Sequence, residues 1–162
     1  MLCLRIHRGI PVHGDDETWV REKAIQAARF LGTELAAHFK AEEEVLFPAM
    51  KEFAGASQLL FNLIDEHRQL QRISDRFHAS GLTAVAGALT EFADLLEAHI
   101  RREERELFPL YESQVARDEA LQIEIAVKAM IGNAAQPKTR PFLNEELSGA
   151  VVLCQTIKMA NA

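Results

Sequence analysis

Two histidine–glutamate pairs with the same spacing stand out in this sequence. His38 precedes Glu42 by four residues, and His99 precedes Glu103 by four. In a helix, residues four apart lie one turn apart on the same face, so each imidazole can converge with its carboxylate on a point beside the helix. Imidazole and carboxylate together are ligands that suit iron, manganese or zinc. The two pairs therefore predict metal binding.

Both pairs belong to an internal repeat. Residues 37–48 read AHFKAEEEVLFP and residues 98–109 read AHIRREERELFP, and seven of the twelve positions are identical. The offset of 61 residues is too long for a solenoid unit and suits alternate helices of one bundle. The repeat therefore predicts two helices that present the same pair of side chains to a common interior.

A third histidine, His67, lies between the two copies, on an apolar stripe formed by Leu60, Leu63, Ile64 and Leu70. A single histidine or glutamate on such a stripe is more often an ordinary core residue. Here, however, two carboxylates share the predicted interior with three imidazoles, and the predicted inner stripes carry no cationic residue to neutralise them. A metal ion would do so. The candidate ligands are His38, Glu42, His67, His99 and Glu103.

Four further glutamates flank the candidate ligands: Glu43, Glu44, Glu104 and Glu106. We expect them to form a solvated, charged face of each helix. Glu43 or Glu104 would become a ligand instead if its helix were rotated about its axis.

Apolar residues recur every three to four positions along almost the whole chain, and no segment alternates as a strand would. Four long helices are expected: from a cap at Asp15 or Asp16 to about Leu46, from Ser57 to Gly81, from Thr83 to Pro109, and from Asp118 to Gly132. A short apolar piece, residues 2–10, precedes them. Pro11 and Gly14 are expected to break the chain after it, and Pro48 to kink or end the following helix. Long helices joined by short loops run antiparallel, so the expected fold is all-α, an up-down four-helix bundle with a truncated first helix and an extra C-terminal helical segment.

The 162 residues have the length of one domain. We expect the bundle to occupy residues 1–132. Residues 133–162 are expected to form a linker and a short helical tail that packs on the bundle or on a partner. The run at 151–157 is equally compatible with an extended segment.

The charge balance limits the partners to consider. Lys and Arg number 18 and Asp and Glu number 24, which gives a net charge of −6. This balance argues against nucleic acid, which requires a phosphate-neutralising surface, and against an anionic membrane. No apolar run is long enough to span a bilayer. Cys3 and Cys154 lack any pairing pattern, so we expect free thiols in a reducing, cytoplasmic protein.

Three segments together resemble the hemerythrin-like, HHE cation-binding family: HFKAEEEVLFP (38–48), DEHRQL (65–70) and HIRREERELFP (99–109). The resemblance covers about residues 17–112. It implies a four-helix bundle that holds a non-haem iron pair, bridged by two carboxylates and capped by histidines. By this resemblance, the second helix supplies His38 and Glu42, the third His67, and the fourth His99 and Glu103. Glu42 and Glu103 would be the bridging carboxylates.

The sequence departs from the family pattern at two places. The family often has a second histidine one turn after its third-helix ligand, and Gln71 stands there. The family's first helix also supplies a histidine, whereas residues 2–10 resemble the later half of that helix. His7 and His13 remain in this region, and neither falls where the resemblance would put the ligand. We expect both to be exposed histidines near the terminus.

The function expected from these observations is O₂, NO or redox sensing, or iron handling, at a pair of iron ions. No positioned nucleophile or substrate motif argues for an enzyme. Two alternatives stay open. An incomplete site would hold a single metal, zinc or iron, as a structural staple. Alternatively, the chain would be an interaction module whose tail packs against a partner or a second copy in a homodimer.

Overall fold

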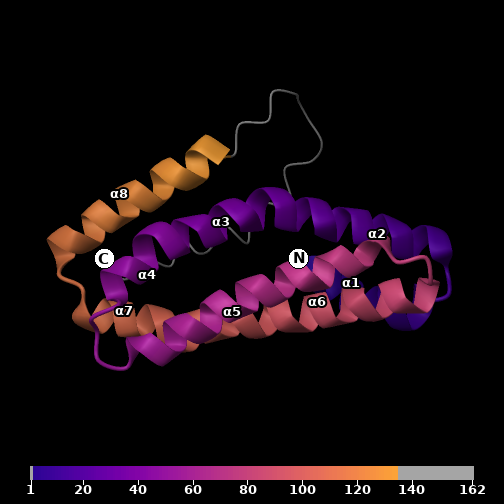
Figure 1. Ribbon diagram of the computed structural model, residues 1–162, viewed down its shortest axis with the longest axis horizontal. Coiled ribbons are helices and arrows are strands. Elements are labelled where there is room, and N and C mark those ends of the chain that lie inside the picture. The colour runs from indigo at the N-terminus through magenta and orange to yellow at the C-terminus, as the bar shows by residue number, and fades with distance from the viewer. Residues whose placement is uncertain (1, 135–162) are drawn as a thin grey trace.

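A computed structural model describes residues 2–134, and every element in this part of the chain is helical. The helices form five rods (Figure 1). The first is α1 (Leu2–His13), the third is α5 (Ala56–Asp75) with a 3₁₀ turn (Arg76–His78), and the fifth is α8 (Arg117–Ala134). The second consists of α2 (Glu17–Phe30), π-helical η1 (Leu31–Leu35), α3 (Ala36–Ala41), π-helical η2 (Glu42–Leu46) and α4 (Phe47–Met50). The fourth consists of α6 (Leu82–Arg102), π-helical η4 (Glu103–Leu107) and α7 (Phe108–Gln114).

The arrangement confirms the predicted all-α bundle. The long rods lie side by side along the longest axis of the molecule, and α8 runs along α3 and η2 (Figure 1). Helix α6 packs against α1, α2 and α5. None of the helices within residues 2–134 combines the length and the apolar character of a membrane-crossing segment. Of the predicted linker and tail at 133–162, residues 135–162 lie outside the described part of the chain.

The apolar core is divided into two clusters. The first gathers buried side chains of α1, α2, α5 and α6 around Phe92. The second gathers side chains of α4, α5, α7 and α8 around Leu63 and Leu107. Along α5, Leu63 belongs to the second cluster and Leu70 to the first, and the polar residues Glu66 and His67 are buried between them. A layer of buried polar side chains therefore separates the two halves of the core.

The ends of several helices differ from the predictions, although the predicted cap at the start of α2 is present: Asp16 Oδ1 accepts a hydrogen bond from the Trp19 N–H at 3.1 Å. Pro11 was expected to break the chain, but it lies inside α1, which continues to His13. A proline removes one backbone hydrogen bond, and only the exposed last residues of this helix follow it. The turn before α5 contains Gly55 with φ of +86°, a left-handed conformation that favours glycine.

Pro48 was expected to kink or end its helix and Pro109 to end one, but the helices continue to Met50 and Gln114. Each proline follows a π-helical segment, in which the Phe47 N–H bonds to the Glu42 carbonyl and the Phe108 N–H to the Glu103 carbonyl, five residues back. In an α-helix the proline ring would clash with the carbonyl four residues earlier. The wider π turn accommodates the ring, so the two copies of the sequence repeat adopt the same local structure.

Candidate metal centre

The buried polar layer contains all five predicted ligands. His38 comes from α3, Glu42 from η2, His67 from α5, His99 from α6 and Glu103 from η4. Four of them, Glu42, His67, His99 and Glu103, each offer one ligand atom, and these atoms lie within 4.8 Å of one another. His38 adjoins this group, because its Nε2 lies 3.0 Å from Glu42 Oε1. The fold therefore brings together residues from three rods that are up to 65 positions apart in the sequence.

The two central imidazoles face each other through their Nε2 atoms, which are 3.3 Å apart. The Nδ1 atom of His67 lies 2.7 Å from Glu43 Oε1, and the Nδ1 atom of His99 lies 2.9 Å from Glu66 Oε2. Because a carboxylate accepts hydrogen bonds, each Nδ1 acts as the donor to its glutamate, and each Nε2 atom faces the interior of the centre. A cation between the two Nε2 atoms would have both nitrogens as ligands.

Carboxylate oxygens complete the cluster around these nitrogens. Glu103 Oε1 lies 3.1 Å from His99 Nε2, and Glu42 Oε2 lies 3.4 Å from His67 Nε2. The second oxygen of Glu42, Oε1, faces His38 instead. The two oxygens of Glu42 are thus directed towards different histidines, which is the arrangement of a carboxylate able to bridge two positions.

Several atoms of the centre are buried without a hydrogen bond. They are His38 Nδ1, both carboxylate oxygens of Glu42, and Glu103 Oε1. Leaving a buried polar atom unpaired costs about 1–3 kcal/mol, and more for a charged group. The donor set therefore fits a cation bound by imidazole nitrogens and carboxylate oxygens.

The pKa shifts of the buried glutamates and histidines also indicate that the centre favours added positive charge. Burial, reinforced by the charge of Glu42, raises the pKa of Glu103 to about 7. Burial also acts to raise the pKa of Glu42, but the charge and close approach of His38 outweigh it and lower that pKa. Burial acts to lower the pKa of His38 and of His99, and their glutamate neighbours reverse this and raise both. Protons thus supply positive charge to the metal-free centre.

The rings of Phe39 and Phe47 both lie nearly parallel to the imidazole of His67. The Phe39 ring is stacked on the imidazole at 3.8 Å between centroids, and the Phe47 ring lies nearly parallel to it at 6.0 Å. Phe39 also meets the His99 ring edge-on at 5.5 Å. These contacts fix the orientation of both imidazoles and exclude water from the rings.

Sequence reasoning missed Glu66 and Arg102. Glu66 hydrogen-bonds His99 and forms an ion pair with Arg102. The signal was present, since Glu66 follows Leu63 by three residues and precedes Leu70 by four, on the buried stripe of α5. We expected no cationic residue on the inner stripes, and Arg102 corrects this expectation because it forms an ion pair with buried Glu66. Glu42 and Glu103, in contrast, form their ion pairs with histidines.

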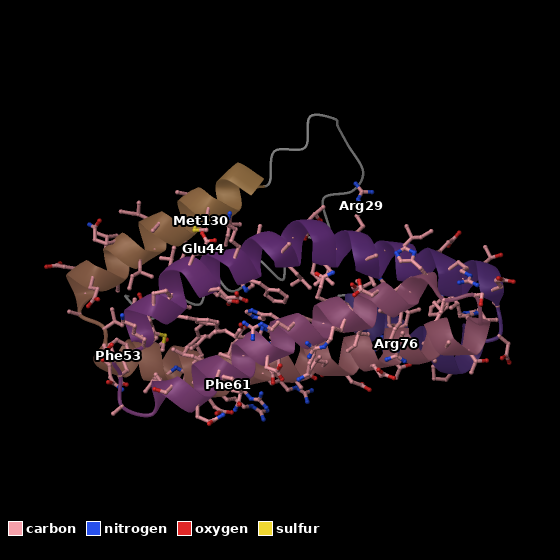
Figure 2. The ribbon with its side chains drawn as sticks, viewed as in Figure 1. Arg29, Glu44, Phe53, Phe61, Arg76 and Met130 are labelled. Atoms are coloured by element: carbon pink, nitrogen blue, oxygen red, sulfur yellow. The ribbon has the colours of Figure 1, made fainter. Side chains whose placement is uncertain are left out.

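The four flanking glutamates differ in their exposure and in the residues that they contact. Glu43, expected to be solvated or a ligand, is partly exposed and contacts His67. Glu104, at the same position of the second repeat, is exposed. Glu44 is exposed, lies 4.0 Å from Lys40, and is on the side of its helix towards α8 (Figure 2). Glu106 is exposed and lies 3.8 Å from Arg102.

The histidines of α1 lie outside the centre. The ring of His7 lies 2.9 Å from Asp94 Oδ1 and 3.6 Å from Glu97 Oε2 on α6. The ring of His13 lies 5.5 Å from that of Trp19. The described part of α1 therefore brings no histidine to the five predicted ligands.

A helical bundle that buries a cluster of histidines and glutamates is typical of a cation-binding helical domain. The chain belongs to the hemerythrin HHE cation-binding domain family, whose model matches residues 2–111. This match includes α1 as well as the region of the earlier resemblance.

One curated relative is a DNA nickase from Nostoc sp. (strain PCC 7120). It is 29% identical over 121 residues, which cover 74% of this chain and 33% of the relative. This chain thus spans about a third of the length of that protein. No solved structure matches the chain.

Proposed function

We propose that this protein binds two non-haem iron ions at the centre, with Glu42 and Glu103 as bridging carboxylates. The observation that carries the proposal is the orientation of Glu42, whose Oε1 faces His38 at 3.0 Å and whose Oε2 faces His67 at 3.4 Å. One ion would be held on each side of this carboxylate. The buried oxygens of Glu42 and Glu103, which face histidines but make no hydrogen bond, support the same conclusion.

The two positions are unequal. The first is surrounded by His67 Nε2, His99 Nε2, Glu42 Oε2 and Glu103 Oε1. The second has His38 Nε2 and Glu42 Oε1 as its contacts. We therefore expect the first ion to bind more tightly and the second to keep coordination positions open to small ligands.

Bound iron would supply reversible redox chemistry and an affinity for O₂ or NO. The chain's own residues would hold the ions, orient the imidazoles through Glu43 and Glu66, and keep water away from His67 through Phe39 and Phe47. We accordingly propose O₂, NO or redox sensing, or iron handling, as the role of the centre.

A structural site for a single zinc or iron ion is the second candidate. It is favoured by the close approach of four ligand atoms, which lie within 4.8 Å of one another and of whose six separations three, at 3.1, 3.3 and 3.4 Å, are close to the edges of a tetrahedron. Ligand distances of about 2.0–2.1 Å around tetrahedral zinc correspond to edges of roughly 3.3 Å.

Elemental analysis of the protein as isolated, together with an absorption spectrum, separates these candidates. Two iron ions per chain, with near-ultraviolet absorption in the ferric state, are expected. In a titration, His38→Ala should reduce the content to one ion per chain, because it removes the histidine of the second position. A single colourless zinc ion, unaffected by His38→Ala, would instead establish the structural site.

For partners, we propose metal ions and O₂ or NO rather than nucleic acid or a membrane. The net charge of −6 disfavours phosphate-rich surfaces. The name DNA nickase belongs to a relative of which this chain spans only about a third. A cytoplasmic location and a homodimer also remain proposals. Light scattering at several protein concentrations tests the dimer.

A further inference from the structure

The candidate ligands are shielded from solvent, with exposed fractions of 1% for His99 and Glu103, 2% for Glu42, 5% for His67 and 6% for His38. Two partly exposed charged side chains contact this layer. The Glu43 side chain is 39% exposed and touches His67, and the Arg102 side chain is 32% exposed and touches Glu66. Among residues 2–134, an acidic and a basic side chain therefore connect the centre to the surface.

The basic side is unsuited to the passage of a cation. Arg102 forms ion pairs with buried Glu66 and with exposed Glu106. Its guanidinium keeps its charge at any physiological pH, so it repels an approaching metal ion.

The acidic side, at Glu43, is suited to attract a cation. Glu43 lies 2.7 Å from His67 Nδ1, and within residues 2–134 it forms no ion pair with a lysine or arginine. Its neighbour Glu44, in contrast, lies 4.0 Å from Lys40. Glu43 thus presents negative charge to solvent, and a single imidazole separates it from the buried Glu42.

The two copies of the repeat differ at this position. In the first copy, Glu43 holds the Nδ1 atom of His67 from the surface. In the second copy, Glu104 is exposed, and buried Glu66 holds the Nδ1 atom of His99. One imidazole is therefore anchored inside the bundle, while the other is anchored to a residue that solvent reaches.

We propose that Glu43 is the point at which a divalent cation enters the centre. Its exposed carboxylate captures the hydrated ion and delivers it along His67 to Glu42, and the waters of hydration return to solvent. This inference rests on the proposed function, since it requires that the centre bind metal.

The test uses the full-length metal-free protein and cobalt(II) alone, with association followed by stopped-flow absorption and dissociation followed after addition of excess chelator. Glu43→Gln removes the charge but keeps an oxygen that accepts the His67 Nδ1–H bond. We expect its association rate constant to fall about threefold to tenfold, because electrostatic steering is lost. Its dissociation rate constant should stay within about twofold. Added salt should slow association for the wild type more than for the variant.

Glu104→Gln is the matched control, because it removes one charge from the same position of the other repeat. Its association rate should equal that of the wild type. Glu66→Gln should leave association unchanged and speed dissociation, because it loosens His99.

An association rate constant that falls equally in Glu43→Gln and Glu104→Gln would overturn the inference, because the effect would then come from net charge and not from the position of Glu43. Faster dissociation of Glu43→Gln with unchanged association would also overturn it, because Glu43 would then only orient His67. A wild-type protein that binds no cobalt would refute the proposed function together with this inference.

Discussion

Glu66 on α5 and His99 on α6 form a buried hydrogen bond, with 2.9 Å between Oε2 and Nδ1. Because Glu66 precedes His67 directly, α5 supplies both a candidate ligand and the group that orients a ligand of the neighbouring helix. Arg102 holds the other oxygen of Glu66. The two central imidazoles are thus positioned by carboxylates rather than by packing alone.

The first prediction concerns this hydrogen bond. Glu66→Gln should weaken metal binding about 10- to 100-fold, the usual effect of removing a group that orients a liganding histidine. Competition with a chromophoric chelator measures the affinity. Glu106→Gln removes the exposed carboxylate beside Arg102 and serves as the control, with an affinity expected to match the wild type. If both variants bind as the wild type does, Glu66 has no part in positioning His99.

The five candidate ligands and the helical fold could be predicted because both leave periodic signals in the sequence. The repeat places His38 with Glu42 and His99 with Glu103 at one-turn spacing, and the apolar stripe around His67 sets its phase. Such patterns follow from the period of a single helix and do not depend on its neighbours. The contact of Glu66 with His99 depends instead on how α5 packs against α6, which no local pattern encodes.

The errors around the prolines have a different cause. An α-helical ladder gives no reason for a helix to continue past Pro48, but the π turn at Glu42–Leu46 widens the helix just before it, and the helix continues to Met50. Glu43 is exposed, as α-helical spacing predicts, yet its carboxylate contacts His67 on a neighbouring helix. Sequence analysis therefore placed Glu42 on the buried face and missed the contact of its neighbour with His67, because that contact depends on how two helices pack.

The second prediction concerns the central histidine. His67→Ala should lose at least part of the bound metal, because the tighter position loses a ligand. A ligand present at a hundred times its Kd stabilises the folded state by about 2.7 kcal/mol, so the metal-dependent rise in melting temperature should shrink or vanish in this variant. Calorimetry with and without metal measures the difference. Unchanged metal content together with an unchanged rise would show that His67 is not a ligand.

The third prediction compares inner and outer glutamates of the two repeats. Glu42→Gln and Glu103→Gln should each weaken metal binding, since a neutral amide bridges poorly and the buried charge that attracts the ion is halved. Glu44→Gln and Glu106→Gln should have little effect, because both side chains are exposed. Isothermal titration of the four variants gives affinity and stoichiometry. Greater damage from the outer pair would mean that the assigned helical phase is wrong.

The fourth prediction concerns the pH dependence of the metal-free protein. Burial and the charge of Glu42 raise the pKa of Glu103 to about 7, from a usual value of 4.5. Between these values the folded protein holds a proton that the unfolded chain releases. This contribution to stability is therefore fully present below about pH 4.5 and declines as the pH rises through about 7.

Metal binding must displace the same proton, so proton release on binding should be larger at pH 6 than at pH 8. Calorimetry in buffers of different ionisation enthalpy counts the released protons. Glu103→Gln cannot hold this proton and should lose that part of the pH dependence, whereas Glu104→Gln should retain it. Equal proton release at both pH values in the wild type, with the same result in Glu103→Gln, would show that Glu103 is already ionised in the metal-free centre.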